Sequence, residues 1–299
     1  MKISPVTQAI LAMAILCLMD PLVKSLATRY PVIEIAFFRF AGGLLISVLL
    51  TLYFRPAWPD KKSFITNGAR SILVAISVLT LFYSLKLLPL ATAVAVSFIS
   101  PVFIVFLAVL VLGERLTLRI ILALVLGVFG LFMILGNSIL GVESSSVSWI
   151  GVAVGVVSAL AYAVSMVILR LRATQDPIVT IIIFQNFTPT LLLLIPCLIL
   201  GWVTPDFKDF LVFLCVGFLG AFGHFLLAQA FSQVSASKLG PVEYTALVWG
   251  VFYGYIFFDE WPQVITIIGA AAILLGAITL NHTSPESVSS NLGTTDDPH

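Results

Sequence analysis

Long apolar runs, separated by short polar segments, fill almost the whole chain. A helix that crosses the hydrocarbon core of a bilayer needs about 20 mostly apolar residues. Cutting the sequence at its charges, prolines and polar clusters yields runs of that length. We predict ten transmembrane helices, over residues 5–27, 34–54, 70–87, 90–112, 119–136, 149–170, 178–201, 210–232, 238–258 and 263–281. Because the connections are short, consecutive helices should run antiparallel.

The composition supports this interpretation. Of 299 residues, 60% are hydrophobic and 10% are charged, and the mean hydropathy is +1.14. Soluble globular domains carry about 25% charged residues. The fold class is therefore an all-α integral membrane protein. The net charge of +1 and the absence of a basic cluster interleaved with aromatics indicate no nucleic-acid partner.

Sequence motifs for catalysis or cofactor binding are missing. Cys17, Cys197 and Cys215 are widely spaced in apolar segments and do not form a metal-binding pattern. The chain contains no phosphate-binding G-x-x-x-x-G-K-[ST] loop, no H-E-x-x-H and no G-x-S-x-G. We therefore expect no cofactor, no metal and no enzymatic activity.

The distribution of lysine and arginine predicts the orientation, because cytoplasmic loops hold the excess of these residues. With a cytoplasmic N-terminus, ten basic residues fall on or near the cytoplasmic side, namely Lys2, Arg55, Lys61, Lys62, Arg70, Arg115, Arg119, Arg170, Arg172 and Lys238. Four fall near the outer side, namely Lys24, Arg29, Lys86 and Lys208. Both termini should be cytoplasmic, in a bacterial inner (plasma) membrane. The polar tail 283–299 should be disordered.

The two halves of the chain align at a constant offset. Pro177 lies 146 positions after Pro31, and Glu260 lies 146 positions after Glu114. A single offset without gaps indicates an internal duplication. We predict a first repeat over 1–141 and a second over 149–281.

Each repeat holds five predicted helices, which is an odd number, so the second copy enters the membrane from the opposite side. Inverted repeats around a central cavity are typical of secondary transporters, which open a midplane site alternately to each side. The alternative to a transporter is a channel or scaffold that was enlarged by the duplication.

Several segments resemble the EamA family of the drug/metabolite transporter superfamily. They are FFR at 37–39, LLPLATAVAVSFISPVFIVFLAVLVLGER at 87–115 and VSASKLGPVEYTALVWGVFYGYIFFDE at 234–260. The resemblance covers all ten predicted helices and implies a two-sided basket of helices around a central cavity.

The resemblance implies transport of a small organic metabolite such as an amino acid, riboflavin or S-adenosylmethionine. Import or export, and proton coupling or facilitated diffusion, stay open. The expected partners are the substrate, the lipid bilayer and protons as a candidate coupling ion, and a monomer can enclose the cavity. The alternatives are a broad-specificity drug exporter, a non-transporting membrane enzyme or an accessory subunit.

The segment LCLMDPLVKSL at 16–26 interrupts the first apolar run with charge. Asp20 and Lys24 are four residues apart and can pair on one helix. Arg39 enters the membrane on the second helix at a similar depth, so it can pair with Asp20 as well. Pro21 removes a backbone hydrogen bond and predicts a kink or a break. The segment is either a polar site or gate, or a static ion pair that fixes the packing.

Three further features stand out in the second half. His224 lies in the middle of its predicted helix and is either a proton or substrate ligand or a packing residue. Gly217, Gly220 and Gly223 predict a close helix contact. In GPVEY at 240–244, Glu243 and Tyr244 either face the cavity or cap a helix at the membrane boundary.

Other polar and aromatic side chains within the predicted helices fit a mostly apolar substrate pocket with a few directing groups. They are Tyr83, Ser97, Ser100, Tyr162, Gln185, Asn186, Gln229 and Trp249. Gln185 lies 146 positions after Arg39, which suggests that the two halves share a cavity wall. The alternative for the tryptophan and tyrosines is an anchoring role at the membrane interface.

Overall fold

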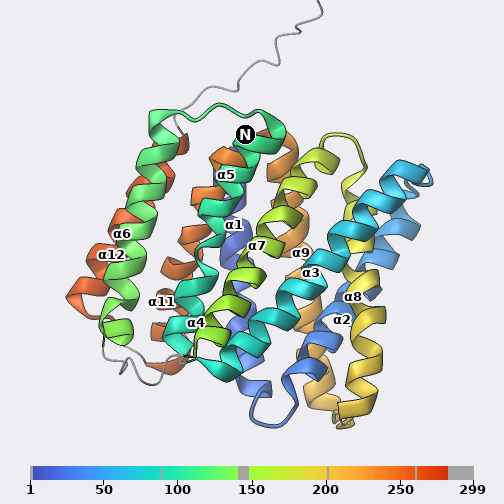
Figure 1. Ribbon diagram of the computed structural model, residues 1–299. Helices are drawn as coiled ribbons and strands as arrows, with labels where there is room; N and C mark the ends of the chain where they lie inside the picture. Colours follow the sequence, from blue (N-terminus) through green and yellow to red (C-terminus); the bar gives the residue numbers. More distant parts are fainter. Residues whose placement is uncertain (1–2, 89, 141–147, 201, 260, 282–299) are drawn as a thin grey trace, which may run out of the picture.

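The structure, a computed structural model, describes residues 3–88, 90–140, 148–200, 202–259 and 261–281 (Figure 1). Within these ranges the regular elements are helices and no strand occurs. They are α1 (Pro5–Leu26), α2 (Val32–Phe54), α3 (Lys61–Leu87), α4 (Leu90–Ser97), α5 (Ser100–Leu112), α6 (Leu118–Leu140), α7 (Trp149–Ala173), α8 (Ile178–Leu200), α9 (Phe207–Gln233), α10 (Ala236–Leu239), the 3-10 helix η2 (Gly240–Tyr244), α11 (Thr245–Phe258) and α12 (Val264–Asn281). The predicted tail 283–299 and Glu260 lie outside the described residues.

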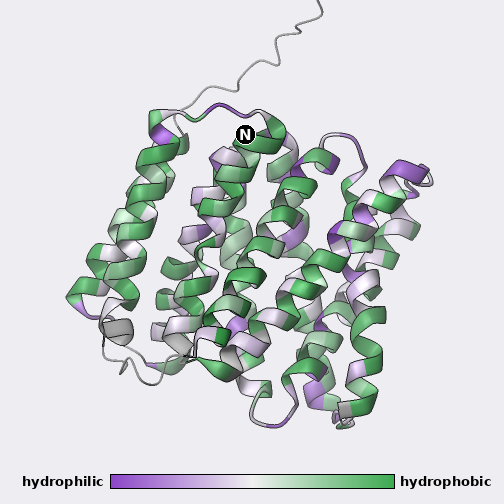
Figure 2. Ribbon diagram, viewed as in Figure 1, coloured by the Kyte–Doolittle hydropathy of each residue, from purple (hydrophilic) through white to green (hydrophobic). Residues whose placement is uncertain are grey.

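The helices are those of a multi-pass integral membrane protein. Eight segments in the described part are long and apolar enough to cross a bilayer, and Val264–Leu280 is a shorter apolar helix. Figure 2 shows hydrophobic residues along most of the helices. Large apolar side chains such as Leu52, Leu110 and Ile199 are exposed, and in a membrane such positions contact lipid.

Helix α3 starts earlier than the hydropathy pattern predicts. The predicted helix began at residue 70, but α3 begins at Lys61 because Asp60 caps it, with Oδ1 accepting from the backbone N of Ser63 at 2.7 Å. Two polar residues of the added turns, Ser63 and Asn67, are buried by protein, as is Arg70, which follows them. Arg70, which the hydropathy pattern placed at the first position of a helix, lies within α3.

Prolines and glycines divide two of the predicted helices but not the first one. Residues 90–112 form α4 and α5 with a break at Phe98 and Ile99, and 238–258 span the end of α10, η2 and α11. Pro101 and Pro241 stand at the start of the elements that follow, where a missing N–H does no harm. Helix α1 runs unbroken through Pro21, so the break predicted there does not occur.

The helices pack in pairs around several hydrophobic clusters, of which one is much larger than the others. Helix α1 packs on α9, α2 on α8 and α9, α3 on α7, and α6 on α12. Figure 1 shows α6 and α12 side by side at one edge of the bundle. The glycine spacing in α9 predicts a close contact, and it is present: a Cβ on Gly217 would lie 2.6 Å from the backbone of Gly42. Small residues thus set the shortest helix separations.

Candidate functional site

Five of the predicted polar residues lie together between the helices. They are Asp20 on α1, Arg39 on α2, Tyr162 on α7, His224 on α9 and Glu243 in η2. Arg39 Nη2 lies 3.4 Å from His224 Nε2, and Tyr162 Oη donates to Glu243 Oε1 at 3.2 Å. The charge of Arg39 acts on both Asp20 and Tyr162, which places all five within electrostatic range of a neighbour. We call these five residues the central cluster.

The Arg39–His224 contact defines the tautomer of the His224 imidazole. A guanidinium has only donors, so Nε2 must accept and the ring proton must sit on Nδ1. The Arg39 guanidinium also lies over the ring of Phe40, 4.9 Å from its centroid. These contacts hold a cation at the centre of the bundle, where a charge is costly and usually has a function.

The central cluster is open at one end and closed at the other. Glu243 is buried, Arg39, Tyr162 and His224 are half-buried, and Asp20 is exposed. No direct ion pair joins Asp20 to Arg39 in the part of the chain that the structure describes, so a static bridge between these two is absent. The side chain of Lys24 lies outside the described residues, and its pairing with Asp20 stays a prediction.

The sequence analysis did not select Arg70 as a site residue. Arg70 on α3 is 1% exposed, and its charge acts on Tyr162 and His224, so it adjoins the central cluster. The available signal was the polar spacing of Ser63, Asn67 and Arg70, which places them on one helix face. The signal was missed because dividing the sequence by hydropathy assigns charged residues to the loops between helices.

Four of the remaining predicted residues are not part of the central cluster. Tyr83 is exposed on α3, and Ser97 Oγ donates to Val94 O in its own helix. Gln229 accepts a hydrogen bond from Gln8, which joins α9 to α1. Trp249 stacks on Tyr253 within α11.

Three other predicted residues are buried. Asn186 Nδ2 donates to Ser47 Oγ at 3.0 Å and binds α8 to α2. Tyr244 stacks on Phe98, with ring centroids 6.0 Å apart. Gln185 is 1% exposed, and its Nε2 has no partner among the described residues. The Tyr244 hydroxyl likewise has no partner among the described residues, so Gln185 and Tyr244 both keep free hydrogen-bonding capacity.

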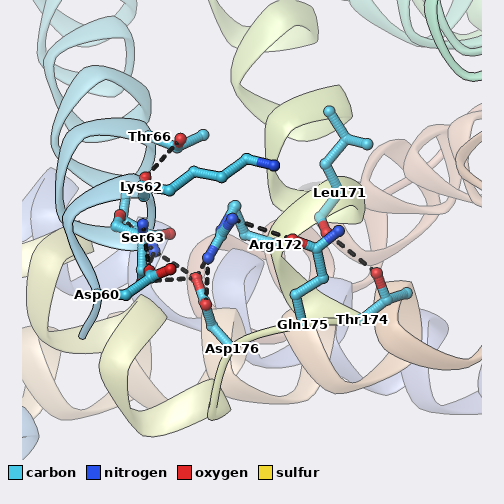
Figure 3. Close-up of polar contacts among 10 residues, drawn as sticks. Asp60, Lys62, Ser63, Thr66, Leu171, Arg172, Thr174, Gln175 and Asp176 are labelled. Carbon is cyan, nitrogen blue, oxygen red and sulfur yellow. Dashed lines mark hydrogen bonds and ion pairs between the residues drawn. The ribbon is translucent and has the colours of Figure 1, made fainter. Parts of the chain in front are cut away.

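A dense polar contact closes the end of the bundle that we predict to be cytoplasmic, which we call the inner end (Figure 3). Asp176, between α7 and α8, accepts from Arg172 Nε at 2.7 Å, from Asn67 Nδ2 at 2.7 Å and from Ser63 Oγ at 2.9 Å. Arg172 Nη2 pairs with its other oxygen. We call Ser63, Asn67, Arg172 and Asp176 the inner clasp, since they bind the start of α3 to the α7–α8 turn.

At the opposite, outer end a similar contact involves another aspartate. Tyr30 Oη donates to Asp209 Oδ2 at 2.8 Å, and Arg29 Nη1 pairs with the same oxygen at 2.6 Å. The ring of Tyr30 meets Phe213 edge-on at 5.2 Å. We call Arg29, Tyr30 and Asp209 the outer contact, which binds the α1–α2 turn to the start of α9.

The inner clasp should depend on pH only under acidic conditions. Burial alone would raise the pKa of Asp176, but the hydrogen bonds from Arg172, Asn67 and Ser63 outweigh it and hold the pKa below its ordinary value of 3.8. A carboxyl group whose pKa is lower in the folded than in the unfolded state stabilises the fold fully at pH values above its unfolded-state pKa. This stabilisation is lost as the pH falls through the folded-state pKa.

We therefore expect the stability difference between wild type and Asp176→Asn to stay constant from about pH 8 to about pH 5 and to shrink below about pH 4. Unfolding in detergent at a series of pH values measures it. A difference that already shrinks near pH 6 would contradict this assignment of the carboxylate.

The central cluster has no features of a metal centre. Among the described residues no group of His, Cys, Asp and Glu could hold a metal ion. Its donors and acceptors can instead bind a polar organic group or a proton. Such a site, enclosed by membrane-crossing helices, fits the recognition of a solute.

Comparisons with known proteins agree with this. The model of the EamA-like transporter family matches residues 3–136 and again residues 149–281. The pseudopaline exporter of Pseudomonas aeruginosa is 29% identical over 281 residues, which cover 94% of this chain and 96% of that protein. The S-adenosylmethionine uptake transporter of Rickettsia prowazekii is 26% identical over 272 residues, covering 91% of this chain and 90% of that one.

A solved crystal structure shares the fold, with a TM-score of 0.81 at 20% identity over 94% of this chain and 99% of that chain. The two family matches together cover most of the sequence, and the related transporters align almost from end to end. The chain belongs to the EamA-like transporter family.

Proposed function

We propose that this protein is a secondary transporter that carries a small organic metabolite across the bacterial inner (plasma) membrane by alternating access. The central cluster is the observation that carries this proposal. Charged and hydrogen-bonding side chains from α1, α2, α7, α9 and η2 meet between apolar helices, where a scaffold would gain nothing from them. The candidate substrates are amino acids, riboflavin and S-adenosylmethionine.

The related transporters support a metabolite substrate but differ in direction. One relative is named for uptake of S-adenosylmethionine and another for export of pseudopaline. The exporter favours export as the direction of a second candidate, a broad-specificity exporter of metabolites or drugs, but its name gives no support for the broad specificity. A non-transporting enzyme or accessory subunit has no comparable support.

We further propose that ten crossings form two inverted five-helix repeats, 1–141 and 149–281. Counting α4 with α5 as one crossing, and α10, η2 and α11 as another, yields ten. The family model matches the chain twice, once in each half. Two inverted halves can rock against each other and open a central site alternately to each side of the membrane.

Contacts that correspond at the 146-residue offset support the repeat. Tyr30 contacts Asp209 at the outer end, and the positions 146 away from them, Asp176 and Ser63, contact each other at the inner end. The helix caps correspond as well, since Asp60 and Asp206 each accept from the backbone N three residues on, at 2.7 Å. Under alternating access the outer contact and the inner clasp would open in turn.

Uptake and counterflow in proteoliposomes test the function. Amino acids, riboflavin and S-adenosylmethionine are offered to wild type and to Asp20→Asn, with and without a pH gradient. We expect saturable flux of one substrate class, reduced about tenfold or more in the variant, because Asp20 offers a charged acceptor at the open end of the cluster. Asp259→Asn is the control, since Asp259 is exposed at the end of α11 in a left-handed conformation that Asn tolerates.

Each other result has a distinct meaning. Flux that survives Asp20→Asn would remove Asp20 from the mechanism and leave His224 and Glu243 as the polar determinants. Flux of many unrelated lipophilic cations would favour the broad exporter. The absence of flux with every compound would contradict transport of these substrate classes.

A further inference from the structure

Three buried hydrogen-bond donors beside the central cluster have no acceptor. Arg70 Nε, Arg70 Nη1 and Gln185 Nε2 lack a partner among the described residues, and both side chains are 1% exposed. Buried polar groups are nearly always hydrogen-bonded, so unpaired donors in a folded protein require an explanation. Three donors on two neighbouring side chains point to a missing acceptor.

The two side chains face the same region of the interior. Among the described residues, the Arg70 guanidinium makes one hydrogen bond, and it is long, from Nη2 to the carbonyl oxygen of Ile181 at 3.5 Å. Ile181 and Gln185 are four residues apart on α8, so they lie on the same helix face. The unpaired amide of Gln185 therefore lies one helical turn from the point where Arg70 meets α8.

The charge of Arg70 also lacks a counterion. No carboxylate pairs with Arg70 among the described residues, although a buried guanidinium is strongly destabilising unless it is paired. The charges of Arg39 and Arg70 both act on the Tyr162 hydroxyl, and Glu243 accepts its hydrogen bond. The site therefore holds two guanidinium groups and the carboxyl group of Glu243 near one hydroxyl, that of Tyr162.

We propose that Arg70 and Gln185 bind a carboxylate of the transported substrate. A guanidinium presents two parallel N–H groups that match the two oxygens of a carboxylate, and the amide of Gln185 supplies a third donor. Arg39, half-buried and closer to the open end, is the first cation that the carboxylate meets. A zwitterionic substrate, whose carboxylate binds Arg70 and whose distant cationic group reaches the Glu243 carboxyl group, matches this arrangement.

This inference rests on the proposed function and specifies its substrate class. It also explains the burial of Arg70: in the conformation described, the carboxylate site is closed, and the substrate reaches it when the helices rearrange. Among the candidates, amino acids and S-adenosylmethionine carry a carboxylate and riboflavin does not.

Matched substrate pairs in proteoliposomes test the proposal. S-adenosylmethionine is compared with its decarboxylated analogue, and amino acids with their amides, for wild type, Arg70→Gln and Arg115→Gln. In wild type we expect the acid to be transported about 10- to 100-fold better than its partner that lacks the carboxylate. Arg70→Gln should abolish that preference by slowing only the acid. Arg115→Gln, at an exposed loop position, should behave as wild type.

A structural role for Arg70 would produce a different pattern, with both members of a pair slowed equally. Because Arg70→Gln can also prevent folding, Gln185→Leu provides a milder variant that removes one donor and should reduce the acid preference in part. Chloride or inorganic phosphate is added as a competitor of the transported acid. Inhibition of acid transport by either anion at concentrations comparable to that of the acid would show a general anion site and overturn the assignment to a substrate carboxylate.

Two failures are distinguishable. Saturable transport of riboflavin, or of an amide as fast as its acid, would overturn the carboxylate site and leave the proposed transporter function intact. No saturable transport of any compound would contradict the proposed function itself, and the carboxylate site with it.

Discussion

Arg172→Ala is expected to destabilise the protein by about 3 kcal/mol, at the lower end of the range for breaking a buried ion pair. Arg172 is buried and Asp176 is half-buried with a largely covered side chain, the side-chain exposures being 5% and 8%, and the arginine binds both carboxylate oxygens. Its removal leaves a buried carboxylate that keeps only the neutral donors Ser63 and Asn67. The free energy of unfolding in mixed detergent micelles measures the loss.

A neighbouring lysine provides the control for this variant. Lys62 is exposed beside the inner clasp (Figure 3), and Lys62→Ala should change stability by no more than about 0.5 kcal/mol. In a double-mutant cycle, Arg172→Ala combined with Asp176→Asn should cost clearly less than the sum of the single changes. Strict additivity would show that the pair contributes nothing to the fold.

Gly217→Val is expected to separate α2 from α9 and to destabilise the protein by about 3 kcal/mol or more. A Cβ at Gly217 would lie 2.6 Å from both Cα and C of Gly42 and 2.7 Å from the backbone N of Gly43. These are backbone atoms, which cannot rotate away as a side chain can. Arg39 on α2 and His224 on α9 should lose their alignment as the helices part.

The yield of monodisperse protein and its thermal unfolding in detergent measure this effect. Gly250→Val on α11 is the matched control, because nothing lies within 4 Å of its added Cβ, and it should fold as wild type does. Gly217→Ala should fall between the two. Wild-type stability of Gly217→Val would mean that the helices can move apart without loss, and that the glycine contact does not determine their separation.

The sequence by itself determined the membrane class and the family. Hydropathy depends on the composition of about 20 consecutive residues, so it can be read without knowing which helices pack together. The apolar runs correspond closely to most of the helices. Glycine spacing likewise predicted the contact at Gly217, because helix geometry alone places residues three apart on one face. The polar interruption at Asp20 and the residues Arg39, Tyr162, His224 and Glu243 were found for the same reason, since a polar side chain within an apolar helix is visible without a structure.

Only the tertiary structure decided which of these polar residues meet and which others join them. Whether a charge within a helix contacts lipid, solvent or another side chain depends on packing between helices far apart in the sequence. Arg70 was therefore assigned to a helix end, and Asp176, in a turn, received no role. The structure places Arg70 beside the central cluster with unpaired donors, and it places Asp176 at the inner clasp. Both positions result from contacts of α3 with α7 and α8, which no local pattern in the sequence encodes.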